Sequence, residues 1–446
     1  MLFGAYLLET VLWLVATIAV SIWATRVYFH SLLALRIGKA GKKQKDAPKK
    51  RSDAPPVTIL LPTYNESEVV DRLLAATTKI DYPSYDIIVA DDSNDGRTMR
   101  SLKRWREKGK LSVVHRSQRS GFKAGALNNA LKFMNPKTEY VLVLDADCVP
   151  PPDLIQRMVS RFSQGDADVV QGYSELSLNS SQNIFTRSQR VSSSSYYLVD
   201  VAARKELSGF IPIFGNAFMI KKSALSRAGG FDESSITEDW ALASSLAELG
   251  SKVFFDETIV VPGECPARFG SIVKQQLRYS EGITRDTKNH VARLLRSKKA
   301  TAMEKFDYLF YGFGAFNSTF GLLSIVLSAF AVLISMGVFE SLGVDRGLIL
   351  GLGLLGQFAL FAVPVYLPLA FLFACSVALY REDKLRELPW CVSSLALNFI
   401  MIPVIVYGSF RGMVLKKGQW ARTPKTGEIT SNGSTKKFTS STYSSL

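Results

Sequence analysis

The sequence predicts an α/β fold, a Rossmann-like domain with a mainly parallel sheet, joined to an α-helical transmembrane region. Three observations support this fold class. Short apolar segments of strand length alternate with helix-like segments over residues 55–265, carboxylates follow several of these segments, and long apolar stretches flank the region on both sides. Alternating strands and helices are typical of parallel sheets that helices cover on both faces.

Size and composition narrow the class of protein. A chain of 446 residues is too long for one ordinary core, so two or more structural units are expected. The net charge of +15 and the 47% hydrophobic content together favour a membrane protein with a cytoplasmic face, and no nucleic-acid partner is expected. The four cysteines are scattered, which excludes a disulfide framework and a paired-cysteine zinc site. The oligomeric state stays open.

Residues 1–28 predict a transmembrane helix, and residues 29–54 a basic cytoplasmic linker. Residues 2–23 are apolar apart from Glu9, are long enough to span a bilayer, and lack the positively charged start of a signal peptide. From Arg26 to Arg51 there are nine Lys or Arg residues and one acid, which places this region in the cytoplasm by the positive-inside rule. The basic run suits a solvated linker and a lipid-binding segment equally well.

Residues 305–415 predict a C-terminal transmembrane region. Apolar stretches lie at 308–338, 348–379 and 388–414, and prolines in the middle stretch leave the number of spans open. The basic residues that follow favour a cytoplasmic C-terminus. We therefore expect a multi-pass protein of the cell membrane whose central domain is cytoplasmic. The basic tail, residues 416–446, is rich in Ser, Thr and Lys from about Ile429, which predicts disorder.

Polar residues gather where the predicted strands end. Four strands are expected, at 57–62, 86–91, 111–115 and 140–144, and ligands of parallel sheets bind at the carboxyl ends of the strands. The polar residues at these ends are Thr63, Tyr64, Asn65 and Glu66 after the first strand, Asp91 and Asp92 at the second, and Asp145 and Asp147 after the fourth. The sequence contains neither a glycine-rich turn after the first strand nor a P-loop. Another group must therefore neutralise the phosphates of a ligand.

Asp145 and Asp147 are the candidate ligands of a divalent cation. Two positions apart on an extended backbone, their side chains point the same way. Carboxylate oxygens suit Mg²⁺ or Mn²⁺, which leave other positions free for water and substrate phosphates. The alternative is that one of these aspartates caps a helix that begins in PPPDL, residues 150–154. Their position at a strand end favours the metal.

Six motifs follow one another along the chain: PTYNE (62–66), DDS (91–93), GFKAGALN (121–128), DAD (145–147), TED (237–239) and QQLRY (275–279). This ordered set resembles the family 2 inverting glycosyltransferases, in particular the membrane-embedded processive branch of cellulose, hyaluronan, chitin and mannan synthases. DDSND and GFKAGAL are most similar to the mannan and glucomannan synthases of plants. The resemblance implies a GT-A glycosyltransferase domain over 55–265, followed by amphipathic interfacial helices over 266–300.

The same resemblance implies the residues that bind a UDP- or GDP-sugar donor. Tyr64 and Glu66 would border the nucleoside pocket, and Asp91, with Asp92 beside it, would bind the base. Lys123 would complement the diphosphate. Asp145 and Asp147 would hold the sugar nucleotide and its Mg²⁺ or Mn²⁺.

Asp239 would be the general base, with Glu238 beside it. It would take the proton of the acceptor hydroxyl, and one in-line displacement would turn an α-linked donor into a β-linkage. The residues alone allow a simpler interpretation, because Thr237 can cap a helix running to Gly250, and acids in a first turn complement the helix dipole. The other motifs favour the base.

Residues 268–299 contain nine basic residues and two acids, with apolar residues at roughly helical spacing. This pattern predicts helices in the membrane interface, with an ordinary basic surface helix as the alternative. By resemblance, Gln275, Arg278 and Tyr279 line the acceptor end of the site. Arg278 would neutralise the departing diphosphate, and Tyr279 would stack on the acceptor sugar.

Two positions depart from the family pattern. Tyr279 stands where the family has tryptophan, and Asn216 of FGNAF stands where it has a hydroxyl residue. Phe214 and Asn216 are expected to contact the acceptor. The segment GQWARTPKTG, residues 418–427, also resembles a family segment, without an assigned role.

The sequence is therefore compatible with three candidate functions. The first is a processive β-glycan synthase that passes its product through its own membrane spans, and the second is transfer of one or a few sugars to a lipid acceptor. The third is a catalytically silent membrane protein that binds nucleotide sugar, which the intact Asp239 and aspartate pair disfavour. The sugar and the linkage are left open.

Overall fold

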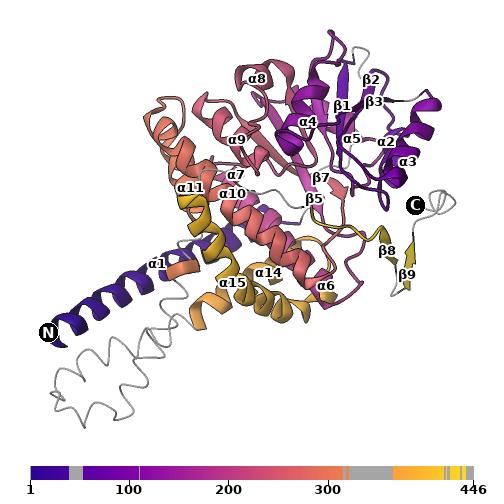
Figure 1. Cartoon of the computed structure of the whole chain (residues 1–446). Coiled ribbons are helices and arrows are strands. Elements are labelled where there is room, and N and C mark those ends of the chain that lie inside the picture. Colours follow the sequence, from indigo (N-terminus) through magenta and orange to yellow (C-terminus); the bar gives the residue numbers. More distant parts are fainter. Residues whose placement is uncertain are drawn as a thin grey trace.

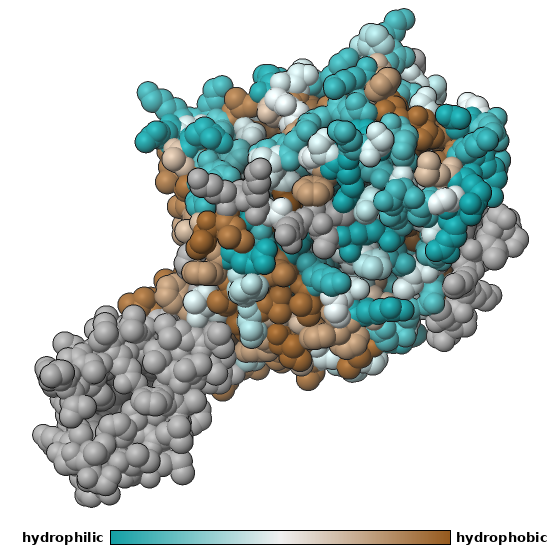
Figure 2. All heavy atoms as spheres, viewed as in Figure 1, coloured by the Kyte–Doolittle hydropathy of each residue, from teal (hydrophilic) through white to brown (hydrophobic). Residues whose placement is uncertain are grey.

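A computed structural model describes residues 2–39, 54–109, 111–314, 318–320, 365–415, 418, 422–431 and 434–437. An α/β domain and a helical region form its two parts (Figure 1). Hydrophobic residues gather over the helical region that includes α15 (Trp390–Val414), whereas the α/β domain presents mostly hydrophilic residues (Figure 2).

A seven-stranded sheet forms the centre of the α/β domain, in the order β3-β2-β1-β4-β6-β5-β7. The strands are β1 (Val57–Thr63), β2 (Tyr85–Asp91), β3 (Ser112–His115), β4 (Tyr140–Val143), β5 (Val169–Glu175), β6 (Phe218–Lys221) and β7 (Val253–Pro262). All pairings are parallel except those of β6, which runs antiparallel to β4 and β5. The mainly parallel sheet confirms the predicted fold class.

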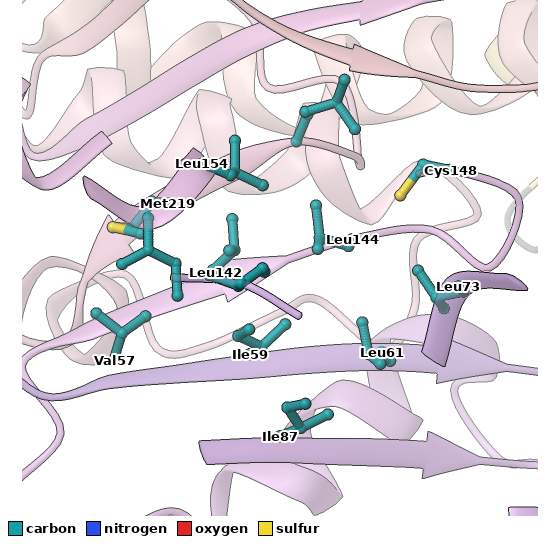
Figure 3. Packing of buried hydrophobic residues seen from close by; sticks show 14 of the residues in the cluster. Val57, Ile59, Leu61, Leu73, Ile87, Leu142, Leu144, Cys148, Leu154 and Met219 are labelled. Carbon is teal, nitrogen blue, oxygen red and sulfur yellow. The ribbon is translucent and has the colours of Figure 1, made fainter. Parts of the chain in front are cut away.

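The central strands are apolar on both faces because helices cover both sides of the sheet. Val57, Ile59 and Leu61 of β1 pack with Leu142 on one face (Figure 3), whereas Leu60 faces the other core. The first core is closed by α2 (Val70–Thr77), α3 (Gly96–Glu107) and α5 (Leu154–Phe162), and the second by α4 (Phe122–Leu131), α8 (Lys222–Arg227) and α9 (Glu238–Glu248).

The helical region is built from segments far apart in sequence. Its elements are α1 (Leu2–Ile37), α6 (Ile184–Ser195), a π-helix η1 (Tyr196–Val201), α7 (Ala202–Glu206), α10 (Phe269–Arg296), α11 (Ala302–Gly312), α14 (Leu367–Arg381), η5 (Leu385–Glu387) and α15. Within the described residues, Thr17–Ile37 of α1 and the whole of α15 are long and apolar enough to cross a membrane. Most of the predicted stretches 308–338 and 348–379 lies outside the described residues, so the number of spans stays a prediction.

Two segments differ from expectation. Residues 269–296 form one helix, α10, whose polar residues Glu281, Arg285 and Asp286 are buried. The tail forms a hairpin of β8 (Glu428–Ser431) and β9 (Ser434–Lys437), where disorder was predicted from about Ile429. The backbone amide of Thr430 donates to the carbonyl of Leu178 at 2.8 Å. Backbone pairing, which composition does not reveal, orders this part of the tail.

Candidate active site

A cleft opens at the carboxyl ends of β1 and β4, where α9 and α10 close its other side. The predicted residues that line it are Tyr64, Glu66, Asp92, Lys123, Asp145, Asp147, Phe214, Glu238, Asp239, Gln275, Arg278 and Tyr279. They come from all six motifs and from the FGNAF segment. The chain brings them together because loops after neighbouring parallel strands meet at one edge of the sheet.

The DAD motif lies in a turn rather than on extended backbone. Strand β4 ends at Val143, and the amide of Cys148 donates to the carbonyl of Asp145 at 3.3 Å. The prediction of an extended backbone is therefore wrong, yet both aspartate side chains line the cleft. Neither caps the following helix, because Asp153 occupies the N-cap position of α5.

Lys123 lies in the first turn of α4 and contacts residues from three other segments around the cleft. Its Nζ lies 2.8 Å from Asp145 Oδ1 and 3.1 Å from Glu238 Oε1, and it donates to the carbonyl of Gly215 at 2.8 Å. Burial alone would lower the pKa of Lys123, but the charges of Asp145, Glu238 and Asp239 outweigh it and raise that pKa. A permanent cation therefore stands between the aspartate pair and the predicted base.

Asp239 is the second residue of α9, and its Oδ1 accepts a hydrogen bond from the amide of Trp240 at 2.9 Å. Burial, followed by the charge of Glu238, raises the pKa of Asp239 to about 7, while Lys123 opposes the rise. Gly215 packs directly on this carboxylate. A Cβ there would lie 2.8 Å from Asp239 Oδ2, and the backbone φ of +69° favours glycine as well.

Thr237 stands at the N-cap position of α9 but its side chain makes no capping hydrogen bond. Its hydroxyl donates instead to Asp286 Oδ2 of α10, at 2.7 Å. The predicted cap by Thr237 is therefore wrong. The helix also ends at Glu248, two residues before the predicted end at Gly250.

Helix α10 supplies the wall of the cleft that was predicted to bind the acceptor. Gln275, Arg278 and Tyr279 lie within one and a half turns of that helix and all line the cleft. The Arg278 guanidinium carbon lies 4.9 Å from the centre of the Tyr279 ring. The positive charge of Arg278, on the other side of the cleft, lowers the pKa of Asp239 and so opposes part of the rise.

Two predicted residues lie behind the cleft wall. Asp91 is buried; its Oδ1 accepts from the hydroxyl of Thr63 at 2.8 Å, and its Oδ2 lies 2.7 Å from His115 Nδ1. Asn216 is also buried, and its Oδ1 accepts from the amide of Asp145 at 2.9 Å. In this arrangement Asn216 holds the DAD turn in place.

Asp92 lines the cleft while paired in a fork with Arg116. Arg116 Nε donates to one carboxylate oxygen at 2.8 Å, and its second nitrogen to the other at 2.7 Å. This bidentate pair fixes the loop that follows β2.

Four residues of the cleft lie outside the six motifs and the FGNAF segment and were not predicted as site residues. The guanidinium of Arg119 lies 3.6 Å over the ring of Tyr64. Arg422 binds Glu66 through two hydrogen bonds of 3.0 and 2.9 Å, Lys425 forms an ion pair with Asp147, and Thr423 lines the wall between them. The three tail residues belong to GQWARTPKTG, so the family-like segment was the available signal.

The charges of the cleft suit a diphosphate ligand with a cation. Within the described ranges no three His, Cys, Asp or Glu side chains form a metal cage. Asp145 and Asp147 instead offer a pair of carboxylates, each of which also contacts a lysine, Lys123 and Lys425 respectively. One or two carboxylates together with substrate phosphates are the usual ligands of Mg²⁺. The residues present therefore fit a divalent ion that a nucleotide ligand helps to hold.

Comparison with known proteins identifies a matching family and several relatives. The family model described as Glycosyltransferase like family 2 matches residues 55–282. The chain is 31% identical over 268 residues to glucomannan 4-beta-mannosyltransferase 7 of Arabidopsis thaliana, and 29% identical over 265 residues to glucomannan 4-beta-mannosyltransferase 1 of Oryza sativa subsp. japonica. The matches cover 58% and 57% of this chain and 48% and 51% of the relatives. The chain thus spans about half the length of the curated relatives it matches.

One solved structure shares the architecture over most of this chain. It is the mannosyltransferase PcManGT from Pyrobaculum calidifontis in complex with GDP-Man and Mn²⁺, which matches with a TM-score of 0.55 and 20% sequence identity. The match covers 88% of this chain and 99% of that chain. At this identity the likeness shows the fold alone, and it confirms the GT-A-like domain.

Proposed function

This chain belongs to the glycosyltransferase-like family 2, and from this premise we propose that it transfers a hexose from a nucleotide-diphosphate sugar to a growing β-linked polysaccharide. The observation that carries the proposal is the cleft itself. It combines a carboxylate whose pKa is about 7, a lysine between acids, and an arginine on the opposite helix. GDP-mannose is the first donor to test, because the relatives carry the name glucomannan 4-beta-mannosyltransferase and the solved mannosyltransferase holds GDP-Man.

The chemistry follows from the arrangement of charges. Asp239 accepts the proton of the acceptor hydroxyl, whose oxygen attacks the anomeric carbon while the bond to the diphosphate breaks. A base with a pKa near the working pH is suited to this task. Lys123 and Arg278 offset the negative charge that develops on the leaving diphosphate. A divalent ion at Asp145 and Asp147, when bound, would neutralise further phosphate charge.

The donor and acceptor occupy opposite parts of the cleft in this proposal. Tyr64, Glu66 and Asp92 surround the nucleotide, with Asp91 supporting their loop from behind. Gln275, Tyr279 and Phe214 surround the acceptor, and the Tyr279 ring, 37% exposed, offers a sugar a flat face. Asn216 acts on the acceptor only through the DAD turn that it holds.

A second cavity supports a polymer product over a glycolipid. Its volume is about 360 Å³, and it lies among α1, η1, α14 and α15. The aromatic residues in its lining are Trp23, Tyr196, Phe310, Tyr311, Phe371 and Phe399. Aromatic faces suit sugar rings. The ring of Tyr196 meets that of Phe214, a cleft residue, edge-on at 5.7 Å, so this pair lies between the two spaces.

The cations of the second cavity already have partners. Arg26 forms an ion pair with Asp307, and Arg204 beside the cavity lies 2.7 Å from Asp200. An uncharged glycan suits this lining better than the phosphate of a lipid acceptor. We therefore infer a multi-pass membrane protein whose cytoplasmic domain makes a glycan and whose helices conduct it. Transfer of one or a few sugars to a lipid remains the alternative function.

Donor screening with product sizing tests the proposal. The purified chain in detergent or vesicles is supplied with radiolabelled GDP- and UDP-sugars one at a time, with Mg²⁺ or Mn²⁺. A polymer, cleaved by an enzyme specific for β-linkages, is expected from one donor. Label confined to the lipid fraction would support the alternative, and nucleotide binding without any transfer would support the silent protein.

A further inference from the structure

A buried carboxylate on α10 holds the loop that leads into the base. Asp286 is 2% exposed, and its Oδ2 accepts hydrogen bonds from Ser235 at 2.6 Å and from Thr237 at 2.7 Å. The hydroxyl of Ser235 in turn accepts a hydrogen bond from the amide of Thr237 at 2.9 Å. All three residues are buried. Because a buried hydroxyl without an acceptor is costly, this cluster fixes the backbone immediately before Glu238.

Close packing of Gly282 against Thr237 forms a second contact between α10 and the start of α9. Gly282 lies one turn before Asp286 on α10, and a Cβ at Gly282 would stand 2.4 Å from the hydroxyl of Thr237. The α10 backbone thus approaches the start of α9 as closely as a glycine allows. Two positions of α10, four residues apart, therefore contact the same threonine.

Helix α10 also bears Arg278 and Tyr279 on the cleft. The direction of the Asp239 side chain depends on where α9 begins, and Asp286 ties that beginning to α10. The separation between the base and the residues of the acceptor side is therefore set through this contact. Asp286 itself is not one of the described residues that line the cleft.

We propose that Asp286 is a positioning residue for glycosyl transfer, which holds Asp239 in register with Arg278 through Ser235 and Thr237. This inference rests on the proposed function, with Asp239 as its base. Asp286 touches neither donor nor acceptor, so its loss should slow the chemical step and spare donor binding. A misplacement of about 1 Å at a reacting group costs about a hundredfold in rate.

The test compares three variants in the full-length chain. Asp286→Ala removes the acceptor of both hydroxyls, Thr237→Val removes one donor at the same shape, and Asp286→Asn keeps an oxygen that can accept. We expect kcat to fall about a hundredfold in Asp286→Ala, with the Kd for the donor diphosphate unchanged. Thr237→Val should lose part of that activity, and Asp286→Asn should recover most of it. The double variant Asp286→Ala/Thr237→Val should lose less than the product of the two single losses.

Thr58→Val is the matched control. The hydroxyl of Thr58, buried in β1, donates to Asp86 at 2.9 and 3.1 Å, which is the same kind of bond at the opposite end of the strand. Its loss should lower thermal stability without lowering kcat. If Thr58→Val and Asp286→Ala lower kcat and stability alike, the role of Asp286 is structural and the inference is wrong.

The other possible outcomes also test the role of Asp286. Near-native kcat in folded Asp286→Ala overturns the inference. If Asp286→Ala does not fold, Thr237→Val and Ser235→Ala decide in its place, and full kcat in both overturns the inference. Wild-type protein and Asp239→Asn are assayed beside these variants. Absence of transfer in the wild type refutes the proposed function, whereas active wild type, inactive Asp239→Asn and active Asp286→Ala refute this inference alone.

Discussion

Replacing Asp239 by asparagine should inactivate the chain and stabilise it at the same time. The folded protein raises the pKa of this carboxyl from 3.8 to about 7, first through burial and then through Glu238. Because the folded state holds the proton more tightly than the unfolded state, ionisation of Asp239 costs stability as the pH rises from 3.8 to about 7. An asparagine side chain does not ionise, so Asp239→Asn escapes this cost.

The size of the effect follows from the shift. Each pKa unit corresponds to about 1.4 kcal/mol, so the full shift sets a ceiling of about 4 kcal/mol. The side chain is only partly buried, and solvent in the cleft screens it, so about 1–2 kcal/mol is expected above pH 7. Below the unfolded pKa of 3.8 the two proteins should unfold alike.

Thermal unfolding across a pH series, in the same detergent for both proteins, measures this difference. The variant should melt higher than wild type at alkaline pH, and the gap should close as the pH falls through the range of the shift. A helix-capping role predicts the reverse, with a loss of about 1 kcal/mol at all these pH values. A variant that melts lower at alkaline pH would refute the assignment of Asp239 as a base with a raised pKa.

Three further predictions concern the same cleft. Transfer should stop in excess EDTA and resume with Mg²⁺ or Mn²⁺, and Asp145→Asn or Asp147→Asn should abolish it in folded protein; full turnover in EDTA would exclude a metal. Arg278→Ala should lower kcat about a hundredfold, equivalent to about 3 kcal/mol of diphosphate stabilisation, and near-native kcat would make Arg278 a packing residue. Glu238→Gln removes a charge that raises the pKa of Asp239, so the acid limb of the kcat–pH profile should move downward from near pH 7. A limb that does not move would mean that the charge of Glu238 does not raise this pKa.

The sheet and its ligand edge were predictable from local patterns. Apolar runs such as Val57–Leu61 predict strands that are buried on both faces, and parallel strands bring their following loops to one edge. The motifs at 62–66 and 145–147 therefore meet, as expected. The turn at Asp145 was not predictable, because the amide of Leu144 still donates to the carbonyl of Leu60 at 3.2 Å before the chain turns. Tertiary pairing decides where such a strand ends.

Contacts over long stretches of sequence account for the other differences. Arg422 lies 356 residues from Glu66, and Lys425 lies 278 residues from Asp147. No periodicity or spacing encodes such pairs. The hydroxyl of Thr237 is a further example. It donates to the buried carboxylate of Asp286, 49 residues away, instead of forming a local helix cap. Local signals predict elements, whereas the partners of buried polar groups depend on the assembled fold.

Donor binding and sugar transfer, measured on one purified sample of Asp239→Asn, test the assignment of Asp239 as the general base most directly. This assignment predicts that the variant binds the nucleotide diphosphate as tightly as wild type in the presence of the divalent ion. It also predicts that transfer falls by about two to four orders of magnitude, the contribution of general-base catalysis. Transfer at the wild-type rate by this variant would contradict the assignment, because the cleft would then act without its base.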